Sequence, residues 1–277
     1  MRQIALVMIL SLPLLASCIP TNANIKMDFQ KVLALKNMVK TLYEKYSSEL
    51  LSLKADNAFR ASLKEQMIKY MKTAKKFIDK GDDYQLAGKE VLAVLHYVVA
   101  FDYLNDVQTL MSFAKVPTLT DYANKLMDIE TFMRANLFNL YLSGTYGKGC
   151  INETRVLYVK VRPLYEAVKS EIIKVINNMP VTFTASLASK TIEIVHKANV
   201  LLILNYLNYL LHGLHDSLPL NLTSTCPPGY GSAPWLKYAC AYAQRPLPPT
   251  PCNAAYSFVL GSVGLKEIAN SLCGVKK

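Results

Sequence analysis

The chain has few charged residues and little glycine. Charged residues account for 18% of its 277 positions and only 11 residues are glycine, whereas hydrophobic residues reach 52%. A disordered chain would be richer in charge, and a collagen-like chain would be far richer in glycine. The composition therefore excludes both classes and predicts a folded globular protein, long enough to bury a substantial core.

No internal hydrophobic run is long enough to cross a membrane. The two most apolar segments, residues 91–101 and 200–211, contain about a dozen residues each and include His96, Asn205 and Asn208. A membrane-spanning helix needs about 20 predominantly apolar residues. Each segment therefore predicts the core of a buried helix in a globular protein.

Catalytic motifs are also missing. No two cysteines have the C-x2-C spacing of a zinc site, and residues 144–149 lack the spacing and the final Ser or Thr of a phosphate-binding loop. Ser232 lies outside any G-x-S-x-G motif. We therefore expect no catalytic and no cofactor-binding residues, and a protein that is not an enzyme. An enzyme with dispersed catalytic residues is the alternative.

The histidines predict no metal site either. Glu193 and His196 stand three residues apart, the spacing with which helical di-iron proteins present a pair of ligands. Such a site needs a second Glu-x-x-His pair, but Ala93 stands three residues before His96. Three further candidate ligands lie near the end of an expected helix, namely His212, His215 and Asp216. Histidines in a last helical turn usually complement the helix dipole, so we expect no metal ligand there.

The N-terminus has the pattern of a secretory signal peptide. Arg2 supplies a positive charge, residues 4–15 form an apolar run, and the small residues at 16–18 offer a cleavage site. We therefore predict a cleaved signal peptide over residues 1–18. The ending LASC also resembles the lipobox of bacterial lipoproteins, in which Cys18 would become the lipid-modified first residue.

The other cysteines and two glycosylation sequons favour a eukaryotic secretory route. Disulfide-bonded cysteines are typical of oxidising compartments. Sequons occur at Asn152 and Asn221, both in segments that we expect to be loops. The sequence thus predicts a secreted, extracellular glycoprotein. A bacterial surface lipoprotein anchored to the membrane through Cys18 is the alternative.

Cysteines concentrate around a proline-rich segment near the C-terminus. Eight prolines between positions 219 and 251 exclude regular helix from this segment. We expect two disulfides that tie it to the final helix, formed among Cys226, Cys240, Cys252 and Cys273. The sequence does not select among their possible pairings. Cys18 and Cys150 are left unassigned, and they can pair only if Cys18 survives signal cleavage.

Helical periodicity runs through most of the chain. Apolar residues spaced alternately three and four apart predict helices that pack side by side, and Asp56 and Asn57 are suitable caps for one of them. The expected helices cover residues 29–53, 57–80, 81–114, 118–142, 163–178, 185–215 and 254–272. We therefore predict an all-α, up-and-down bundle of about six helices, followed by a proline-rich, disulfide-linked segment and a final helix. The expected domains are the signal peptide, the bundle over 19–216, and the C-terminal segment with its helix over 217–277.

The second expected helix has one basic and one apolar face. At about 100° per residue, five apolar residues fall on the side of Leu63, namely Met67, Tyr70, Ala74, Phe77 and Ile78. Four lysines gather on the opposite side, namely Lys69, Lys72, Lys76 and Lys80. In a chain with a formal charge of +11, such a face attracts anionic partners. We therefore expect a non-enzymatic binding protein whose partner is an extracellular protein, a glycan or an anionic lipid surface, and not a nucleic acid.

The interior suggests a second function. Residues 200–211 are apolar on every side, which predicts that the other helices enclose this one. Asn199, Asn205 and Asn208 are spaced along it, and the chain contains 17 tyrosines. Such a bundle can house a lipid or another apolar small molecule, with amides and hydroxyls at its polar end. A carrier of such a ligand is therefore the alternative function.

Overall fold

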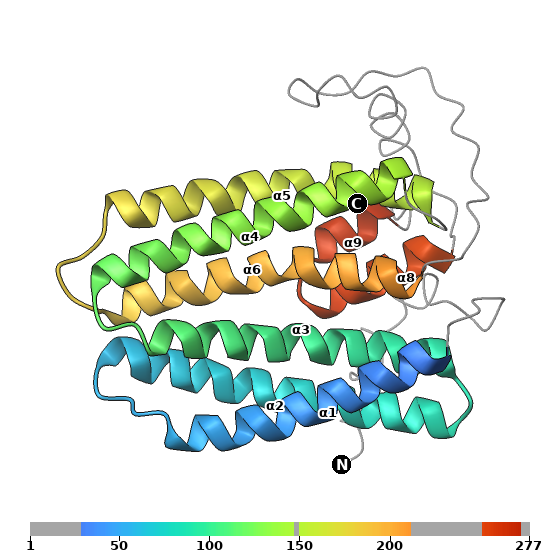
Figure 1. Cartoon of the computed structure of the whole chain (residues 1–277), viewed down its shortest axis with the longest axis horizontal. Coiled ribbons are helices and arrows are strands. Elements are labelled where there is room, and N and C mark those ends of the chain that lie inside the picture. The colour runs from blue at the N-terminus through green and yellow to red at the C-terminus, as the bar shows by residue number, and fades with distance from the viewer. Residues whose placement is uncertain (1–28, 147–149, 212–250, 273–277) are drawn as a thin grey trace, which may run out of the picture.

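A computed structural model of the chain describes residues 29–146, 150–211 and 251–272. These residues form eight α-helices and no β-strand (Figure 1). The helices are α1 (Phe29–Ser52), α2 (Ala58–Leu86), α3 (Glu90–Ala114), α4 (Leu119–Tyr146), α5 (Ile151–Asn177), α6 (Ala185–Leu210), α8 (Pro251–Ser262) and α9 (Lys266–Leu272). The predicted all-α fold is thereby confirmed. The expected signal peptide and most of the proline-rich segment lie outside the described residues.

The six long helices run side by side along the long axis of the molecule (Figure 1). Helices α1, α2 and α3 pack together on one side, and α4, α5 and α6 pack together on the other. The two groups meet where α6 packs against α2 and α3. At one end of the bundle α8 and α9 pack against each other, and α8 also contacts α3 and α6. The structure is therefore a helical bundle, as expected.

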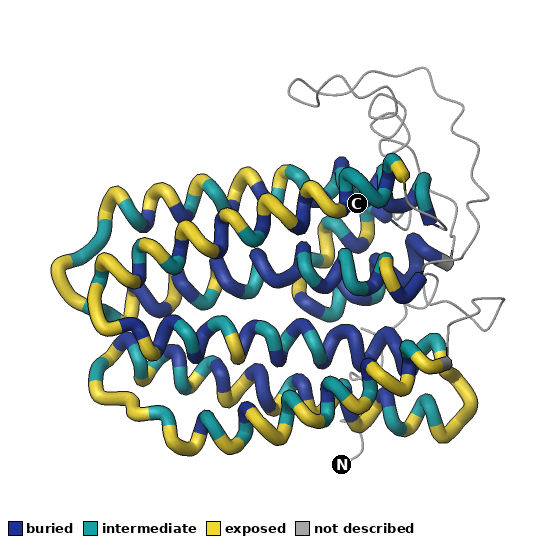
Figure 2. The backbone as a smooth tube through the Cα atoms, in the orientation of Figure 1, coloured by how far each residue is buried: buried dark blue, intermediate teal, exposed yellow. Residues whose placement is uncertain are grey.

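Helices α3 and α6 occupy the centre of this bundle. Sixteen of the 25 residues of α3 and 13 of the 26 residues of α6 are buried, and Figure 2 shows dark blue stretches along both helices. Helix α6 contacts α2, α3, α4, α5 and α8. The expectation that an apolar α6 is enclosed by other helices is confirmed, and α3 shares this central position.

The boundary between α2 and α3 lies later in the chain than predicted. Helix α2 continues through Gly81 to Leu86, and α3 begins at Glu90. A Cβ atom at Gly81 would lie 2.5 Å from Cε1 of Tyr97, so glycine here allows the Tyr97 ring to pack against the α2 backbone. The chain turns instead at Gly88, whose φ of 68° favours glycine. The predicted helix start at Gly81 is therefore wrong, since Gly81 lies inside α2.

Three further helix boundaries differ from the prediction. Helix α4 extends to Tyr146, and its Gly144 carbonyl accepts a hydrogen bond from Arg155 Nε at 2.6 Å. Helix α5 begins well before Pro163, which lies inside the helix on its exposed side. The expected final helix is divided between α8 and α9 by a turn at Gly264, whose φ is 87°.

The Asp82 carboxylate joins the first three helices. It lies 3.2 Å from Lys36 Nζ and 2.7 Å from Lys40 Nζ of α1, and it accepts a hydrogen bond from the Tyr97 hydroxyl of α3 at 2.6 Å. Partial burial raises the pKa of Asp82, but the hydrogen bonds from these three partners outweigh burial and lower it. Lys36, which interrupts the otherwise apolar packing face of α1, therefore serves as a partner for this acid.

One disulfide links Cys150, which precedes α5, to Cys252 in the first turn of α8. Their Cα atoms are 6.1 Å apart. The expected pairing of Cys252 within the set of four C-terminal cysteines is therefore wrong, and Cys150 does have a partner. The starts of α5 and α8 lie together, as the 3.1 Å contact between the Thr154 and Tyr256 hydroxyls confirms. The other cysteines lie outside the described residues, namely Cys18, Cys226, Cys240 and Cys273.

The first glycosylation sequon lies in a helix, not in the expected loop. Asn152 stands in the first turn of α5. Thr154, the third residue of the sequon, is 1% exposed, and its hydroxyl donates to the Cys150 carbonyl at 2.7 Å. Thr154 thus stabilises the junction between α5 and α8. The second sequon, at Asn221, lies outside the described residues.

Candidate functional site

The basic face of α2 forms where the periodicity of the sequence predicts it. All four predicted lysines are exposed, namely Lys69, Lys72, Lys76 and Lys80. The residues predicted to lie opposite them are buried, apart from the half-buried Phe77, and comprise Leu63, Met67, Tyr70, Ala74 and Ile78. These apolar residues pack toward α3 and α6, because α2 contacts both helices. The lysines are left on the outer surface of the bundle.

The exposed face of α2 also carries acidic residues, which divide the lysines into two groups. Lys69 lies 2.7 Å from Glu65, and the neighbouring Lys75 lies 2.5 Å from Asp79. By contrast, no ion pair within the described part of the chain involves the three remaining lysines, namely Lys72, Lys76 and Lys80. We call these three the lysine row. Each follows the last by four residues, so they are spaced about 6 Å apart along the helix axis.

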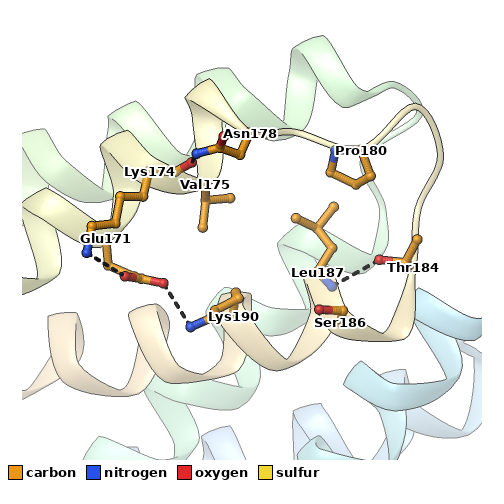
Figure 3. Close-up of a pocket in the computed structure, with 9 residues that line it drawn as sticks. All are labelled: Glu171, Lys174, Val175, Asn178, Pro180, Thr184, Ser186, Leu187 and Lys190. Atoms are coloured by element: carbon orange, nitrogen blue, oxygen red, sulfur yellow. Dashed lines mark hydrogen bonds and ion pairs between the residues drawn. The ribbon is translucent and has the colours of Figure 1, made fainter.

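Two surface hollows are lined by described residues. The first, of about 360 Å³, lies where the turn joins α5 to α6, and Figure 3 shows Glu171 and Lys190 facing each other across it at 2.9 Å. Thr184 caps α6 at its edge by accepting a hydrogen bond from the Leu187 amide at 3.1 Å. The second, of about 350 Å³, lies between α3, α4 and α6 and reaches Asn199. Both hollows are open to solvent, so neither supports the carrier hypothesis.

His96 is a core residue. Its ring is 6% exposed and lies within 6 Å of three aromatic rings, those of Phe77, Tyr84 and Phe258. Nδ1 donates a hydrogen bond to the Leu92 carbonyl at 2.7 Å. Burial lowers the pKa of His96, which favours the neutral ring. The predicted helix-end set of His212, His215 and Asp216 lies outside the described residues.

A second polar site lies in the centre of the bundle. Asp102 and Asp106 stand one turn apart on α3, both fully buried, and His196 of α6 lies beside them. One ligand-type atom from each of the three residues falls within 4.8 Å of the others. Asn199, one turn further along α6, donates a hydrogen bond to Asp106 Oδ1 at 2.8 Å. We call Asp102, Asp106 and His196 the Asp–His cluster.

Both ring nitrogens of His196 face hydrogen-bond acceptors. Nδ1 lies 2.5 Å from Asp106 Oδ2, and Nε2 lies 2.8 Å from the Val263 carbonyl oxygen. When Asp106 Oδ2 and the Val263 carbonyl both accept, both nitrogens donate, and the ring is an imidazolium cation. Burial lowers the pKa of His196, but the hydrogen bond and charge of Asp106 outweigh burial and raise it to about 9.

Asp102 is the unusual member of the cluster. Its side chain is fully buried, and within the described part of the chain neither of its oxygens has a hydrogen-bond partner. Burial first, and then the negative charge of Asp106, raise the pKa of Asp102 well above its usual range, and the charge of His196 opposes them. Native proteins nearly always satisfy buried polar atoms, so an orphaned carboxyl requires a functional or structural explanation.

Aromatic residues enclose the imidazole. The rings of Tyr70 and Tyr103 stack on it with centroids 5.6 and 5.9 Å away. Tyr103 also donates a hydrogen bond to the Ser262 carbonyl at 3.1 Å. Burial raises the pKa of Tyr103 to about 12, which keeps its hydroxyl protonated. The cluster is thus held by residues of α2, α3 and α6 and by the end of α8.

Neither Asp102 nor Asp106 was predicted from the sequence. Glu193, the sequence neighbour considered as a partner for His196, lies half-exposed and binds Lys197 at 2.6 Å, whereas His196 faces Asp106 of α3. The sequence does contain a signal, because two acids four residues apart stand in a helix whose N-terminal half is largely apolar. Their convergence with His196 depends on the packing of α3 against α6, which the sequence pattern does not specify.

None of the described helices is both long and apolar enough to cross a membrane. No protein-family model matches the chain, and neither a curated protein nor a solved structure is significantly similar to it. The lysine row and the Asp–His cluster are therefore interpreted from their own geometry.

Proposed function

We propose that this chain is a secreted, non-enzymatic binding protein that binds an anionic extracellular macromolecule through the lysine row. The observation that carries the proposal is the exposure of Lys72, Lys76 and Lys80 at consecutive turns of α2, with no ion-pair partner among the described residues. Evenly spaced positive charges along a helix axis suit a linear polyanion. A sulfated glycan is therefore the first candidate partner.

Two features support secretion. The N-terminal pattern is that of a signal peptide, and the Cys150–Cys252 disulfide is typical of proteins that mature in oxidising compartments. We propose cleavage of the signal in a eukaryotic secretory pathway. Mass spectrometry of the mature protein tests this, because an acylated N-terminal Cys18 would establish the lipoprotein alternative instead.

Heparin affinity chromatography tests the lysine row. We expect the wild-type protein to bind heparin and to elute at high salt, because interactions between exposed charges are strongly screened. Replacing all three row lysines with glutamine should lower the eluting salt concentration markedly. A wild-type protein that does not bind would contradict the proposal.

A charge-matched control separates the lysine row from net charge. Lys54, Lys174 and Lys266 are exposed lysines on separate parts of the bundle, and changing them to glutamine removes the same formal charge. We expect a clearly smaller loss of retention for this variant. Equal losses for the two triple variants would show that binding follows overall charge, and would exclude the row as a specific site.

A further inference from the structure

We propose that Asp102, Asp106 and His196 bind a divalent transition-metal ion through one oxygen of each carboxylate and Nδ1 of the imidazole. This site is independent of the lysine row and lies in the centre of the bundle, between α3 and α6. The three candidate ligand atoms lie within 4.8 Å of one another. Ligand atoms about 2.0–2.2 Å from a shared ion lie about 3–3.5 Å from one another. The more distant members of the set would therefore move closer together, and Nδ1 and Asp106 Oδ2, which face each other directly, would move slightly apart.

The surroundings of His196 already match those of a metal-bound histidine. Metal-binding histidines usually donate a hydrogen bond from the second ring nitrogen to a carbonyl or carboxylate, which fixes the orientation of the ring. In this structure Nε2 faces the Val263 carbonyl at 2.8 Å, and Nδ1 faces Asp106 Oδ2, with an Asp102 oxygen close by. Binding the ion displaces the proton on Nδ1 and any proton on Asp102 to solvent, while Nε2 keeps its proton and donates it to the Val263 carbonyl.

Asp106 is oriented in a similar way. Asn199 donates to Asp106 Oδ1 at 2.8 Å, and Oδ2 faces His196. One oxygen is therefore held by a neutral amide and the other remains directed into the cluster, where it can bind the ion. Asn199 is in this sense a positioning residue, and not a ligand.

Asp102 provides the observation that favours a metal over a structural ion pair. The ion pair between His196 and Asp106 does not need Asp102. Asp102 nevertheless places a second carboxyl in the same buried space, and neither of its oxygens has a hydrogen-bond partner in the described residues. A divalent cation would satisfy one of these oxygens directly. It would also balance the formal charge of two ionised carboxylates, which is the main cost of burying both.

The ligand types indicate which class of ion fits. Imidazole favours Zn²⁺, Cu²⁺, Fe²⁺ and Ni²⁺, whereas Mg²⁺ and Ca²⁺ prefer sites made of oxygen atoms only. One nitrogen and two carboxylates therefore predict selectivity for an ion such as Zn²⁺ over Mg²⁺. The ion can approach from the His196 side, where the side chain keeps 22% of its surface exposed.

Zinc titration of the full, oxidised chain tests the proposal. After treatment with EDTA and desalting, we expect calorimetry to detect about one Zn²⁺ per chain at this site, and no comparable binding of Mg²⁺ or Ca²⁺. Bound Zn²⁺ should also raise the thermal midpoint, because an ion that binds only the folded state stabilises it. Failure of Zn²⁺, Co²⁺ and Mn²⁺ to bind in the same assay would overturn the proposal.

Variants assign the bound ion to the cluster. Asp102→Asn and His196→Gln should each weaken Zn²⁺ binding by at least about 100-fold, since removal of residues that only orient a ligand already costs 10–100-fold. Asn199→Ala should give an intermediate loss. Asp102→Asn is expected to fold, because Asp102 loses no hydrogen bond within the described chain, and circular dichroism checks this.

Two control variants complete the test. Glu193→Gln changes a half-exposed acid one turn from His196 that binds Lys197 instead, and it should leave Zn²⁺ affinity unchanged. A variant with both His212 and His215 changed to glutamine should also keep the affinity. Loss of Zn²⁺ binding in either control but not in Asp102→Asn would place the ion elsewhere and overturn the assignment.

Discussion

The lysine row of α2 and the Asp–His cluster are two groups of charged residues that differ in exposure, in sign of charge and in the number of helices that supply them. The row is exposed and carries one sign of charge on a single helix. The cluster is buried, carries both signs and is assembled from α3 and α6. Exposed lysines are solvated and cost the fold little, whereas a buried carboxylate costs several kcal/mol unless its partners are in place. Charged side chains on the surface can therefore bind a partner molecule at little cost to the fold, whereas charged side chains in the core need hydrogen-bond or ion-pair partners beside them.

The largest expected effect on stability is that of replacing Asp106, one of the two buried acids. The variants at Asp106 and Asp102 are compared in the presence of EDTA, so that no bound metal contributes. Asp106→Ala removes hydrogen bonds to both His196 and Asn199, so we expect it to lower the free energy of unfolding by about 3–5 kcal/mol. Asp102→Ala leaves a cavity of the same size but breaks no hydrogen bond in the described chain, and should cost less than half as much. Urea unfolding followed by circular dichroism measures both. Equal losses would mean that the ion pair contributes nothing specific.

The disulfide supplies a covalent counterpart to the buried ion pair. Changing Cys150 and Cys252 together to serine should lower the free energy of unfolding by about 2–4 kcal/mol, because the bridge restricts a long loop in the unfolded chain. Calorimetry of the double variant against the oxidised wild-type protein measures the loss. Because the bridge links residues 102 positions apart, an effect near zero would contradict its role in holding α8 against α5.

Asp82 lies between the two extremes, since its side chain is 28% exposed and it binds two lysines and a tyrosine. Its pKa is lowered in the folded state, so its stabilisation is fully present above the unfolded pKa of about 4 and is lost as pH falls through the folded pKa. Asp82→Asn should cost about 1.5 kcal/mol at pH 7. The variant should then lose less stability than the wild-type protein on further acidification, as unfolding midpoints measured between pH 7 and pH 3 would reveal. Parallel pH curves would contradict this role.

The smallest expected effect on stability per substitution is that of the lysine row. Replacing Lys72, Lys76 and Lys80 with glutamine should change the free energy of unfolding by no more than about 0.5 kcal/mol per site, because surface substitutions away from specific contacts rarely do more. The same variant should elute from heparin at a markedly lower salt concentration. A large loss of stability would mean that these lysines have a structural role, and the contrast with the buried cluster would fail.

Local patterns predicted the features that depend on local physics. Apolar residues of α1 spaced three or four apart were predicted to face the neighbouring helices, and Val32, Val39 and Tyr46 are indeed buried. Asn57 caps α2 by accepting a hydrogen bond from the Arg60 amide at 2.9 Å, as its residue type predicts. Helical periodicity and capping involve residues within one or two turns of each other, so the sequence displays them directly.

The errors have a common physical cause. Gly81 has the residue type of a helix end, but it lies within α2 because Tyr97 of another helix packs against its backbone. Cys252 follows the proline-rich segment, but its partner Cys150 stands 102 residues away. In both cases the deciding contact comes from a distant part of the chain, and residue type alone does not indicate it.

By itself the sequence determined the helical class of this protein and the two faces of α2, because both follow from which residues recur every three or four positions. It also determined the enclosed position of α6, because that helix is apolar on every side. The tertiary structure decided what the remaining polar residues do. His196 had a candidate partner three residues away in Glu193, yet the packing of α6 against α3 directs it to Asp106. The buried site exists because that packing brings side chains from two helices, far apart in the sequence, into one place.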